Sequence, residues 1–298
     1  MRILRVLAAA SVVAALALTA CGSAEDQAPG SDSTTLAVGS QAYYSNEIIA
    51  EIYAQALEAK GYEISREFRI GQREAYLPEL ESGSVDIMPE YTGNLLQYLD
   101  PQSTATTAEE IQTALGQALP TTLTALTPAQ ATDQDSYTVT RTTAEQYQLT
   151  SIADLTRLPA PVAVAGNYEL ETRPYGIPGL KSVYGVDAKL SPVDDSGSTL
   201  TVKALVDGQV QVANIYTASP AIKANDLVTL EDPQSMILPQ QVMPIVSSKV
   251  DEKARETLNE ISAQLSTTEL VNLNDRSVNQ QLSPGVIAGD WLRSKGLA

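Results

Sequence analysis

The sequence of 298 residues contains no histidine, a single cysteine, one phenylalanine and one tryptophan. Without histidine the chain has no Ser-His-Asp triad, no imidazole acid or base and no histidine-ligated metal. A single cysteine excludes an internal disulfide and a thiolate metal cluster. Basic residues number only 19 against 36 acidic ones, and phosphate binding needs clustered Lys and Arg. We therefore expect no metal, no cofactor and no nucleic-acid partner.

Tyrosine is the one abundant aromatic residue, with 13 copies in the chain. Hydrophobic residues make up 43% of the sequence, which is enough apolar material for the cores of two compact lobes. The tyrosine excess therefore requires an explanation beyond ordinary composition.

Residues 1–20 have the features of a secretory signal, because a basic start precedes an apolar run over residues 6–18 that is short for a membrane span. The run ends in LTA followed by Cys21, the bacterial lipobox pattern, in which the cysteine is lipidated and becomes the first mature residue. A signal peptide with a chance cysteine is the alternative. Residues 21–35 are small and polar and predict a flexible tether. We expect an extracytoplasmic protein anchored by lipid to the outer face of the cell membrane.

Hydrophobic periodicity predicts alternating strands and helices at the start of the globular part. The expected elements are a strand at 36–39, a helix at 45–61, a strand at 62–70, a helix at 76–82 and a strand at 85–88. This β-α-β-α-β order predicts a parallel sheet with helices on its faces.

The rest of the chain repeats this alternation. We expect a helix at 108–119, a strand at 137–140, a helix from 143, a strand at 162–165, a helix near 180, a strand at 189–193, a helix at 199–207, strands at 210–215, from about 227 and at 243–247, and two helices ending at 298. The simplest packing is two α/β lobes with a ligand cleft between them.

The tyrosines divide into two groups by their place in these elements. Those on helical patterns are Tyr53, Tyr98 and Tyr147, and those at strand ends or in loops are Tyr43, Tyr44, Tyr91, Tyr137, Tyr168, Tyr175 and Tyr216. A single such ring is commonly a core or half-buried side chain. Several rings around one point instead form a cage whose negative faces attract a quaternary ammonium group, which has no hydrogen to donate.

Acidic residues offer a weaker, catalytic alternative. Asp86 and Glu90 bracket a strand end and are the one pair that suggests a carboxylate-using, lipid-anchored hydrolase. Asp194 and Asp195 precede Ser-Gly and a helix start, which favours a capping role. No catalytic motif accompanies these carboxylates, so we expect a protein that is not an enzyme.

Several segments of the chain together match one family pattern. They are GSQAYYSNEIIAEIYAQALEAKGYEI, VDIMPEYTGNLLQYL, DSYTVTRTTAEQYQLTSIADL, RPYGIPGLKSVYG, ALVDGQVQVANIYT, DLVTLEDPQ and WLRSKGLA. On these segments the chain, from about residue 36 to 298, resembles the substrate-binding proteins of osmoprotectant ABC importers, a ProX/OpuC-like family that binds glycine betaine, choline or carnitine.

The resemblance implies an α/β, two-lobed periplasmic-binding-protein fold of type II, with the cleft between lobes that are joined by two crossover strands. Residues 36–128 and 233–298 are expected to form lobe 1, and residues 129–232 lobe 2. The implied function is to capture a betaine-like solute and deliver it to separate permease chains. We expect a monomer that touches the membrane only through its lipid. The alternative is a binding protein for another small polar solute.

The resemblance also implies site residues. Three tyrosines match positions of the family's ammonium box: Tyr91 of PEYTG, Tyr137 of DSY and Tyr216 of NIYT. Asp135 matches a position whose main-chain carbonyl faces the cation. Arg173 matches the arginine that pairs with the ligand carboxylate, for which a planar guanidinium is well suited.

The chain departs from the family pattern at three positions. Gln41 replaces a common lysine, Asn94 a common threonine and Gln240 a usual tyrosine. Each change keeps a hydrogen-bonding group, but together the three changes remove one positive charge and one ring from the expected site. Tyr43 and Tyr44, which follow the first strand, are expected to supply a replacement aromatic wall.

Overall fold

The structure, a computed structural model, describes residues 35–298. The expected signal peptide, the lipidation site Cys21 and all but the last residue of the expected tether lie outside the described residues. Among the described helices, none has the length and apolar character needed to cross a membrane.

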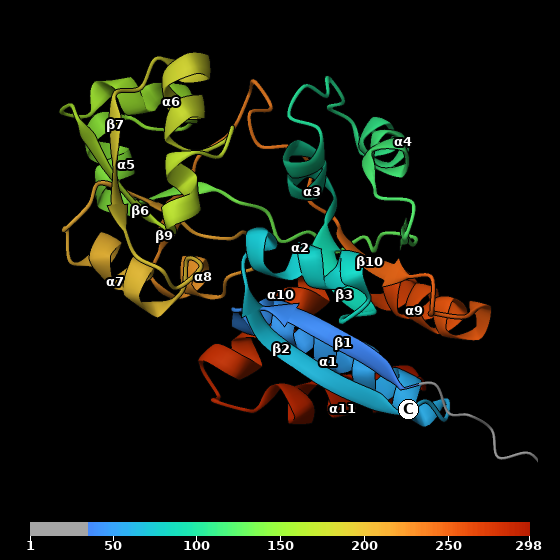
Figure 1. Cartoon of the computed structure of the whole chain (residues 1–298). Helices are drawn as coiled ribbons and strands as arrows, with labels where there is room; N and C mark the ends of the chain where they lie inside the picture. The colour runs from blue at the N-terminus through green and yellow to red at the C-terminus, as the bar shows by residue number, and fades with distance from the viewer. Residues whose placement is uncertain (1–34) are drawn as a thin grey trace, which may run out of the picture. The chain divides into compact units, whose positions relative to one another are not determined.

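The first sheet has the strand order β2-β1-β3-β10-β4 (Figure 1). Its strands are β1 (Leu36–Gln41), β2 (Ile64–Gly71), β3 (Ile87–Tyr91), β4 (Leu123–Ala125) and β10 (Val242–Ser247). β1 pairs in parallel with β2 and β3, which confirms the parallel arrangement predicted from the β-α-β-α-β order. β10 pairs antiparallel with β3 and β4, so this late strand lies inside the same sheet, between β3 and the edge strand β4.

Helices of the first sheet bury its faces. They are α1 (Tyr44–Ala59), α2 (Arg73–Ser82), α3 (Thr92–Leu99), α4 (Ala108–Ala118), α9 (Glu252–Gln264), α10 (Thr267–Val278) and α11 (Pro284–Lys295). α1 packs on β1 and β2, and α10 and α11 pack on α1 (Figure 1). The run Ile48, Ile49 and Ile52 is fully buried in this packing, as its helical spacing predicted.

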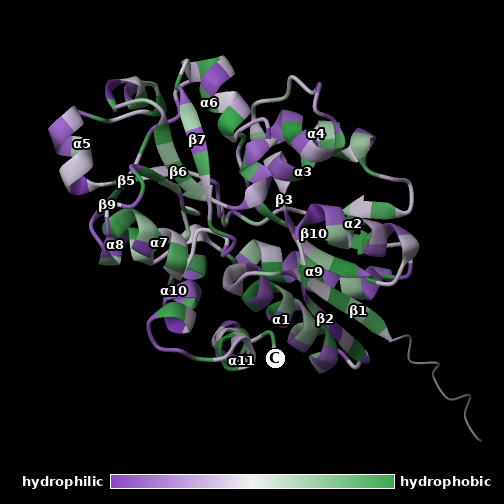
Figure 2. Cartoon of the chain, turned by 60° about the vertical axis from the view of Figure 1, so that its left-hand side comes forward, coloured by the Kyte–Doolittle hydropathy of each residue, from purple (hydrophilic) through white to green (hydrophobic). Residues whose placement is uncertain are grey.

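The second sheet has the order β7-β6-β8-β5-β9. Its elements are β5 (Tyr137–Thr140), α5 (Arg141–Tyr147), the short helix η1 (Ile152–Arg157), β6 (Val162–Gly166), η2 (Tyr168–Glu171), α6 (Ile177–Tyr184), β7 (Ala188–Pro192), α7 (Thr199–Val206), β8 (Val212–Asn214), α8 (Ala221–Ala224) and β9 (Leu227–Thr229). Figure 2 shows hydrophobic colours along β1 and β6, each of which has a neighbouring strand on both sides in its sheet.

The structure departs from the expected elements in the C-terminal helices, at α3 and β4, and in the short helices η1, η2 and α8, which were not expected. The C-terminal region contains three helices instead of two, because Asp251, Ser266 and Ser283 each cap a new helix start through a side-chain oxygen. Strand β4 was not expected, and helix α3 was indicated only by the helical pattern that contains Tyr98. α3 follows β3 directly, and β4 has only three residues, which is too short for a periodicity signal.

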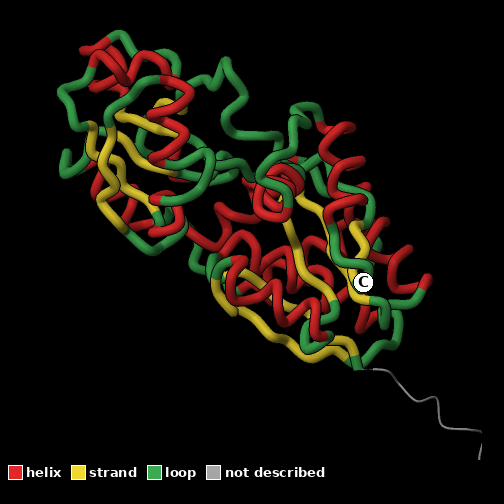
Figure 3. The backbone as a smooth tube through the Cα atoms, turned by 45° about the horizontal axis from the view of Figure 1, so that its top comes forward, coloured by secondary structure: helices red, strands yellow, loops and turns green. Residues whose placement is uncertain are grey.

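Two segments connect the sheets, residues 126–136 between β4 and β5 and residues 230–241 between β9 and β10. They run antiparallel where they meet, with a bridge between Thr132 and Gln241. The pairing continues into the start of β10, where Val242 N donates to Ala131 O at 2.9 Å and Ala129 N donates to Val242 O at 2.8 Å. Figure 3 shows the strands in two separate groups joined by loops. We call the elements of the first sheet lobe 1 and those of the second sheet lobe 2. The expected boundaries after residues 128 and 232 fall inside these connections, and their exact places stay a prediction.

Candidate ligand site

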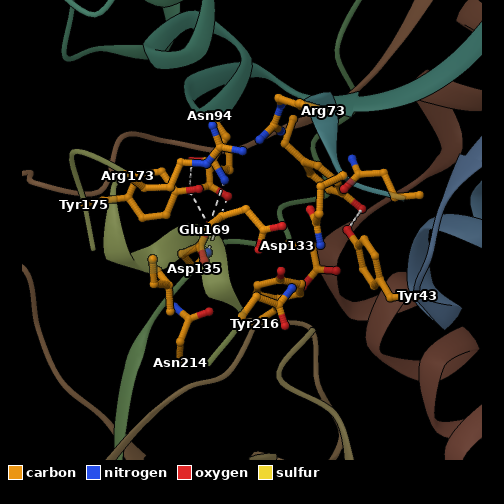
Figure 4. A pocket seen from close by; sticks show the side chains of 16 residues that line it. Tyr43, Arg73, Asn94, Asp133, Asp135, Glu169, Arg173, Tyr175, Asn214 and Tyr216 are labelled. Atoms are coloured by element: carbon orange, nitrogen blue, oxygen red, sulfur yellow. Dashed lines mark hydrogen bonds between the residues drawn. The ribbon is translucent and has the colours of Figure 1, made fainter. Parts of the chain in front are cut away.

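A pocket lies where the two lobes face each other across the connecting segments (Figure 4). Side chains from both sheets line it. They are Gln41, Tyr43, Gln72, Arg73, Tyr91, Asn94, Asp133, Asp135, Asn167, Glu169, Leu170, Arg173, Tyr175, Asn214, Tyr216 and Gln240. Eight of these belong to the set predicted from the sequence, namely Gln41, Tyr43, Tyr91, Asn94, Asp135, Arg173, Tyr216 and Gln240.

Three tyrosine rings converge at one end of the pocket. The ring of Tyr43 lies 5.3 Å from that of Tyr216 in an edge-on arrangement and 6.4 Å from that of Tyr91. Tyr43 precedes α1, Tyr91 ends β3 and Tyr216 follows β8, so strand ends of both sheets supply the cluster. The Tyr43 hydroxyl donates to the Tyr91 hydroxyl. Burial raises the pKa of all three phenols, which therefore stay neutral.

Two predicted tyrosines, Tyr137 and Tyr44, are not among the residues that line the pocket. Tyr137 is 1% exposed, and its hydroxyl donates to the carbonyl of Tyr175 at 2.7 Å. Tyr44 packs edge-on against Tyr43 with 6.5 Å between ring centroids and lines a neighbouring cavity together with Ser219. Tyr44 thus packs on a lining ring, and Tyr137 is bonded to the main chain of the lining residue Tyr175. A direct contact between either side chain and a ligand stays a prediction.

Two of the three residues that depart from the family pattern, Asn94 and Gln240, form a hydrogen-bonded group with Asp135. Asn94 Nδ2 donates to Asp135 Oδ2 at 2.7 Å, and Gln240 Nε2 donates to Asn94 Oδ1 at 2.8 Å. The three side chains come from α3, the first connection and the second connection. Burial raises the pKa of Asp135, while the bonds from Asn94 and Asn214 oppose that shift. The group ties lobe 1 to both connecting segments at the floor of the pocket.

Gln41 is the third residue that departs from the family pattern. It lines the pocket, and its side-chain N–H group makes no hydrogen bond within the described residues. The side chain is 5% exposed, and its Nε2 has no hydrogen-bond partner among residues 35–298. A buried amide that lacks a partner is costly unless a ligand or water accepts from it. Gln41 is therefore placed to donate a hydrogen bond to an oxygen atom of a ligand.

The two arginines that line the pocket are both bound by carboxylates. Arg73 donates from Nε and Nη2 to the two carboxylate oxygens of Glu90, both at 2.8 Å, and the Tyr76 hydroxyl donates to the same carboxylate. Arg173 Nη2 lies 2.8 Å from Glu74 Oε1. The predicted contact between Arg173 and a ligand carboxylate stays a prediction.

Arg173 also spans the lobes. It follows η2 in lobe 2, whereas Glu74 lies on α2 of lobe 1. Its guanidinium carbon lies 5.2 Å from the ring centroid of Tyr98 on α3, again in lobe 1. One side chain thus joins the two lobes at the rim of the pocket by an ion pair and a cation-π contact.

The sequence analysis missed eight lining residues: Gln72, Arg73, Asp133, Asn167, Glu169, Leu170, Tyr175 and Asn214. Tyr175 was among the loop tyrosines, and its RPYG segment was the available signal. Asp133 precedes Asp135 by two residues, so the DQDS segment carried a signal for both. Asn214 is the first residue of the NIYT segment, which was its available signal. The remaining residues stand at strand ends, at a helix start or in short turns and belong to no recognisable motif.

The carboxylates considered for catalysis have structural partners. Asp86 accepts from Ala37 N at 3.0 Å and from Ser247 Oγ at 2.8 Å, and Glu90 is held by Arg73. Asp195 accepts from Leu200 N at 2.6 Å at the start of α7, which confirms the predicted capping role.

A family model described as the substrate binding domain of ABC-type glycine betaine transport systems matches residues 34–294. The chain belongs to this family. Its relatives include the glycine betaine-binding protein YehZ of Escherichia coli strain K12, which is 27% identical over 276 residues, with 87% of this chain and 90% of YehZ covered. A glycine-betaine-binding protein of Pseudomonas aeruginosa is 25% identical over 282 residues, with 88% of each chain covered.

The fold is likewise that of the family. The structure matches a crystal structure described as a glycine betaine/carnitine/choline ABC transporter with a TM-score of 0.70, at 19% identity, over 88% of this chain and 99% of that chain. At this identity the match bears on the fold alone. It confirms the expected two-lobed periplasmic-binding-protein fold of type II.

Proposed function

We propose that this family member captures a quaternary-ammonium solute, of the class of glycine betaine, choline and carnitine, and delivers it to the permease of an ABC importer. The convergence of Tyr43, Tyr91 and Tyr216 on one end of an interlobe pocket carries this proposal. Neutral phenol rings present negative faces to a cation that cannot be held by donated hydrogen bonds. The names of the glycine betaine-binding relatives support the same ligand class.

Capture requires that the lobes close on the ligand. The pocket is lined from both lobes, and the two connecting segments that run between them are the natural hinge for such a motion. Closure brings the Tyr216 ring of lobe 2 against Tyr43 and Tyr91 of lobe 1. The permease then distinguishes the closed, loaded protein from the open one.

The remaining parts of the proposal concern location and assembly. We infer an extracytoplasmic monomer that is held at the membrane by a lipid on Cys21, with the permease as separate chains. No catalytic step is assigned to the site. The carboxylates Asp86 and Glu90 are each engaged by donors of the protein itself, which argues against the hydrolase alternative.

Calorimetric titration of alanine variants tests the ring cluster. Tyr91→Ala and Tyr216→Ala are each expected to weaken binding of a quaternary-ammonium ligand by about 1 to 3 kcal/mol, from lost cation-π attraction and lost burial. Tyr168→Ala is the matched control, because this ring is 64% exposed and does not line the pocket. Unchanged affinity in both pocket variants, with the control also unchanged, rejects the cluster as the binding site.

The ligand itself is identified by thermal shift. Glycine betaine, choline, carnitine, proline betaine and ectoine are compared at equal concentration, because a ligand that binds only the folded state raises the unfolding temperature by mass action. At least one quaternary-ammonium compound is expected to raise it. A shift produced by ectoine alone points to a different polar solute.

A further inference from the structure

The positive charges that line the pocket are already neutralised. Arg73 is 5% exposed and is bound through two hydrogen bonds to Glu90, which is fully buried. Arg173 is paired with Glu74 at 2.8 Å. Each arginine and its partner form a neutral unit, so neither brings a free positive charge to a ligand.

The negative charges that line the pocket have no such partners. Asp133, Asp135 and Glu169 form no ion pair with any Lys or Arg within residues 35–298. Neutral donors hold the two aspartates: Ser45 and the main chain of Ala218 bind Asp133, and amide side chains bind Asp135. The pocket therefore carries a surplus of negative charge.

Glu169 differs from the two aspartates because part of its carboxylate is unused. Its Oε2 is buried and has no hydrogen-bond partner in the described part of the chain. The residue lies on η2 and lines the pocket, and Figure 4 shows it in the middle of the view beside Asp135 and Asp133. A buried, unbound carboxylate oxygen is costly unless a ligand compensates it, and a cation does so best.

Gln41 carries a second buried polar atom in the pocket that has no hydrogen-bond partner among the described residues. Its buried Nε2 is available for one ligand oxygen, for which a hydroxyl suffices. A ligand carboxylate satisfies the same donor but adds a negative charge to a pocket in which Asp135, Glu169 and the ionised form of Asp133 have no cationic partner among the described residues. Like charges at short range in a low-dielectric site repel strongly.

We infer that Glu169 makes the pocket selective for a quaternary-ammonium alcohol, which is a net cation, over a betaine, which carries its own carboxylate. This selectivity rests on the proposed function, because it presupposes that the tyrosines hold the ammonium group. Glu169 supplies the counter-charge, Gln41 binds the hydroxyl, and Arg173 remains with Glu74.

Choline and glycine betaine are the two probes, since both carry a trimethylammonium group and only the second has a carboxylate. Calorimetric titration of the unaltered protein is expected to show tighter binding of choline. Glu169→Gln keeps the shape of the side chain and removes its charge, so it is expected to weaken choline binding about tenfold, as loss of one nearby opposite charge implies. Binding of glycine betaine is expected to stay the same or to strengthen.

Two further variants make the result specific. Glu171→Gln changes an exposed carboxylate on the same short helix and is expected to leave both affinities unchanged. Glu169→Asp retains the charge and is expected to keep the preference for choline. Thermal unfolding of each variant checks that it is folded.

The outcomes separate the selectivity from the proposed function. If glycine betaine binds as tightly as choline, or if Glu169→Gln leaves the ratio of the two affinities unaltered, the role of Glu169 is wrong while quaternary-ammonium binding stands. If neither compound binds the unaltered protein, the proposed function fails and the selectivity fails with it.

Discussion

Asp133 occupies the junction of three structural parts. It lies on the first connecting segment; its Oδ2 accepts from Ser45 Oγ of α1 at 2.9 Å, and its Oδ1 accepts from the main-chain N–H of Ala218 in lobe 2 at 3.0 Å. Burial raises the pKa of this carboxyl group to about 7, and the nearby charge of Asp135 adds to the shift. The group is thus poised to change its ionisation within the neutral range.

The sign of the resulting pH dependence follows from linkage. Because the folded pKa of Asp133 is raised above its unfolded value of about 3.9, the native state binds this proton more tightly. The stability that it contributes is fully present below about pH 4 and is lost as the pH rises to about 7. Asp133→Asn mimics the protonated group and is expected to remove this contribution to the pH dependence.

Urea unfolding of the unaltered protein and of Asp133→Asn at pH 4, 6 and 8 measures this effect. The unfolding free energy of Asp133→Asn minus that of the unaltered protein is expected to increase as the pH rises. The increase is expected to reach up to about 4 kcal/mol, since each pKa unit corresponds to about 1.4 kcal/mol. Asp187→Asn, at an exposed position, serves as the control. A difference that is constant from pH 4 to 8 contradicts the raised pKa.

At the residue scale, the sequence predicted the aromatic part of the pocket better than its polar part. Tyr91 and Tyr216 lie in the recognisable segments PEYTG and NIYT at strand ends, where a ring reaches a cleft. Glu169 lies on the short helix η2 outside any recognisable motif, and its buried oxygen has no hydrogen-bond partner in the described part of the chain. Such a feature follows from tertiary packing, which neither composition nor spacing reveals.

At the element scale, helix α3 depends on a close approach to the second connecting segment. Gly93 N donates to Pro239 O at 3.0 Å. A Cβ atom at Gly93 would lie 2.6 Å from both Leu238 Cβ and Pro239 O. The glycine of PEYTG is therefore required by packing, and it sets the position of the neighbouring Asn94 in the pocket.

Gly93→Ala is expected to destabilise the protein by about 1 to 3 kcal/mol, because the added methyl group forces α3 away from the connecting segment. Ligand affinity is expected to fall as well, since Asn94 moves with α3. Urea unfolding and calorimetric titration measure the two effects. Gly116→Ala in α4 is the control, where nothing lies within 4 Å of the added Cβ, and there a small gain in stability is expected. Equal stability of the two variants contradicts the packing role.

The secondary-structure predictions are wrong where an element is short or where its start lies within a longer helical pattern. The final helical region was expected as two helices, although Ser266 with Glu269 forms a capping box that marks an additional start. β4 pairs over only three residues with β10, so its existence depends on a neighbour that is far away in the sequence. The long, periodic α1 was predicted within two residues at either end.

At the scale of the whole molecule, Arg173 provides a contact that crosses between the lobes at the pocket rim. It reaches Glu74 on α2 at 2.8 Å and lies over the ring of Tyr98 on α3 at 5.2 Å. Its side chain is only 12% exposed, which strengthens the pair relative to one in open solvent. An interlobe contact of this kind favours the closed arrangement, which in the proposed function retains the ligand.

Glu74→Gln is therefore expected to speed dissociation of a bound quaternary-ammonium ligand by about twofold to fivefold, which corresponds to the loss of up to about 1 kcal/mol from a partly exposed ion pair. Stopped-flow measurement of ligand release, with the intrinsic fluorescence of the tyrosines as the signal, gives the rate directly. Glu79→Gln is the matched control on the same helix, because its side chain is exposed and forms no ion pair among the described residues. The association rate is expected to change little, since the pair forms only after the lobes approach. Identical release rates for Glu74→Gln and the unaltered protein contradict a role for Arg173 in holding the lobes together.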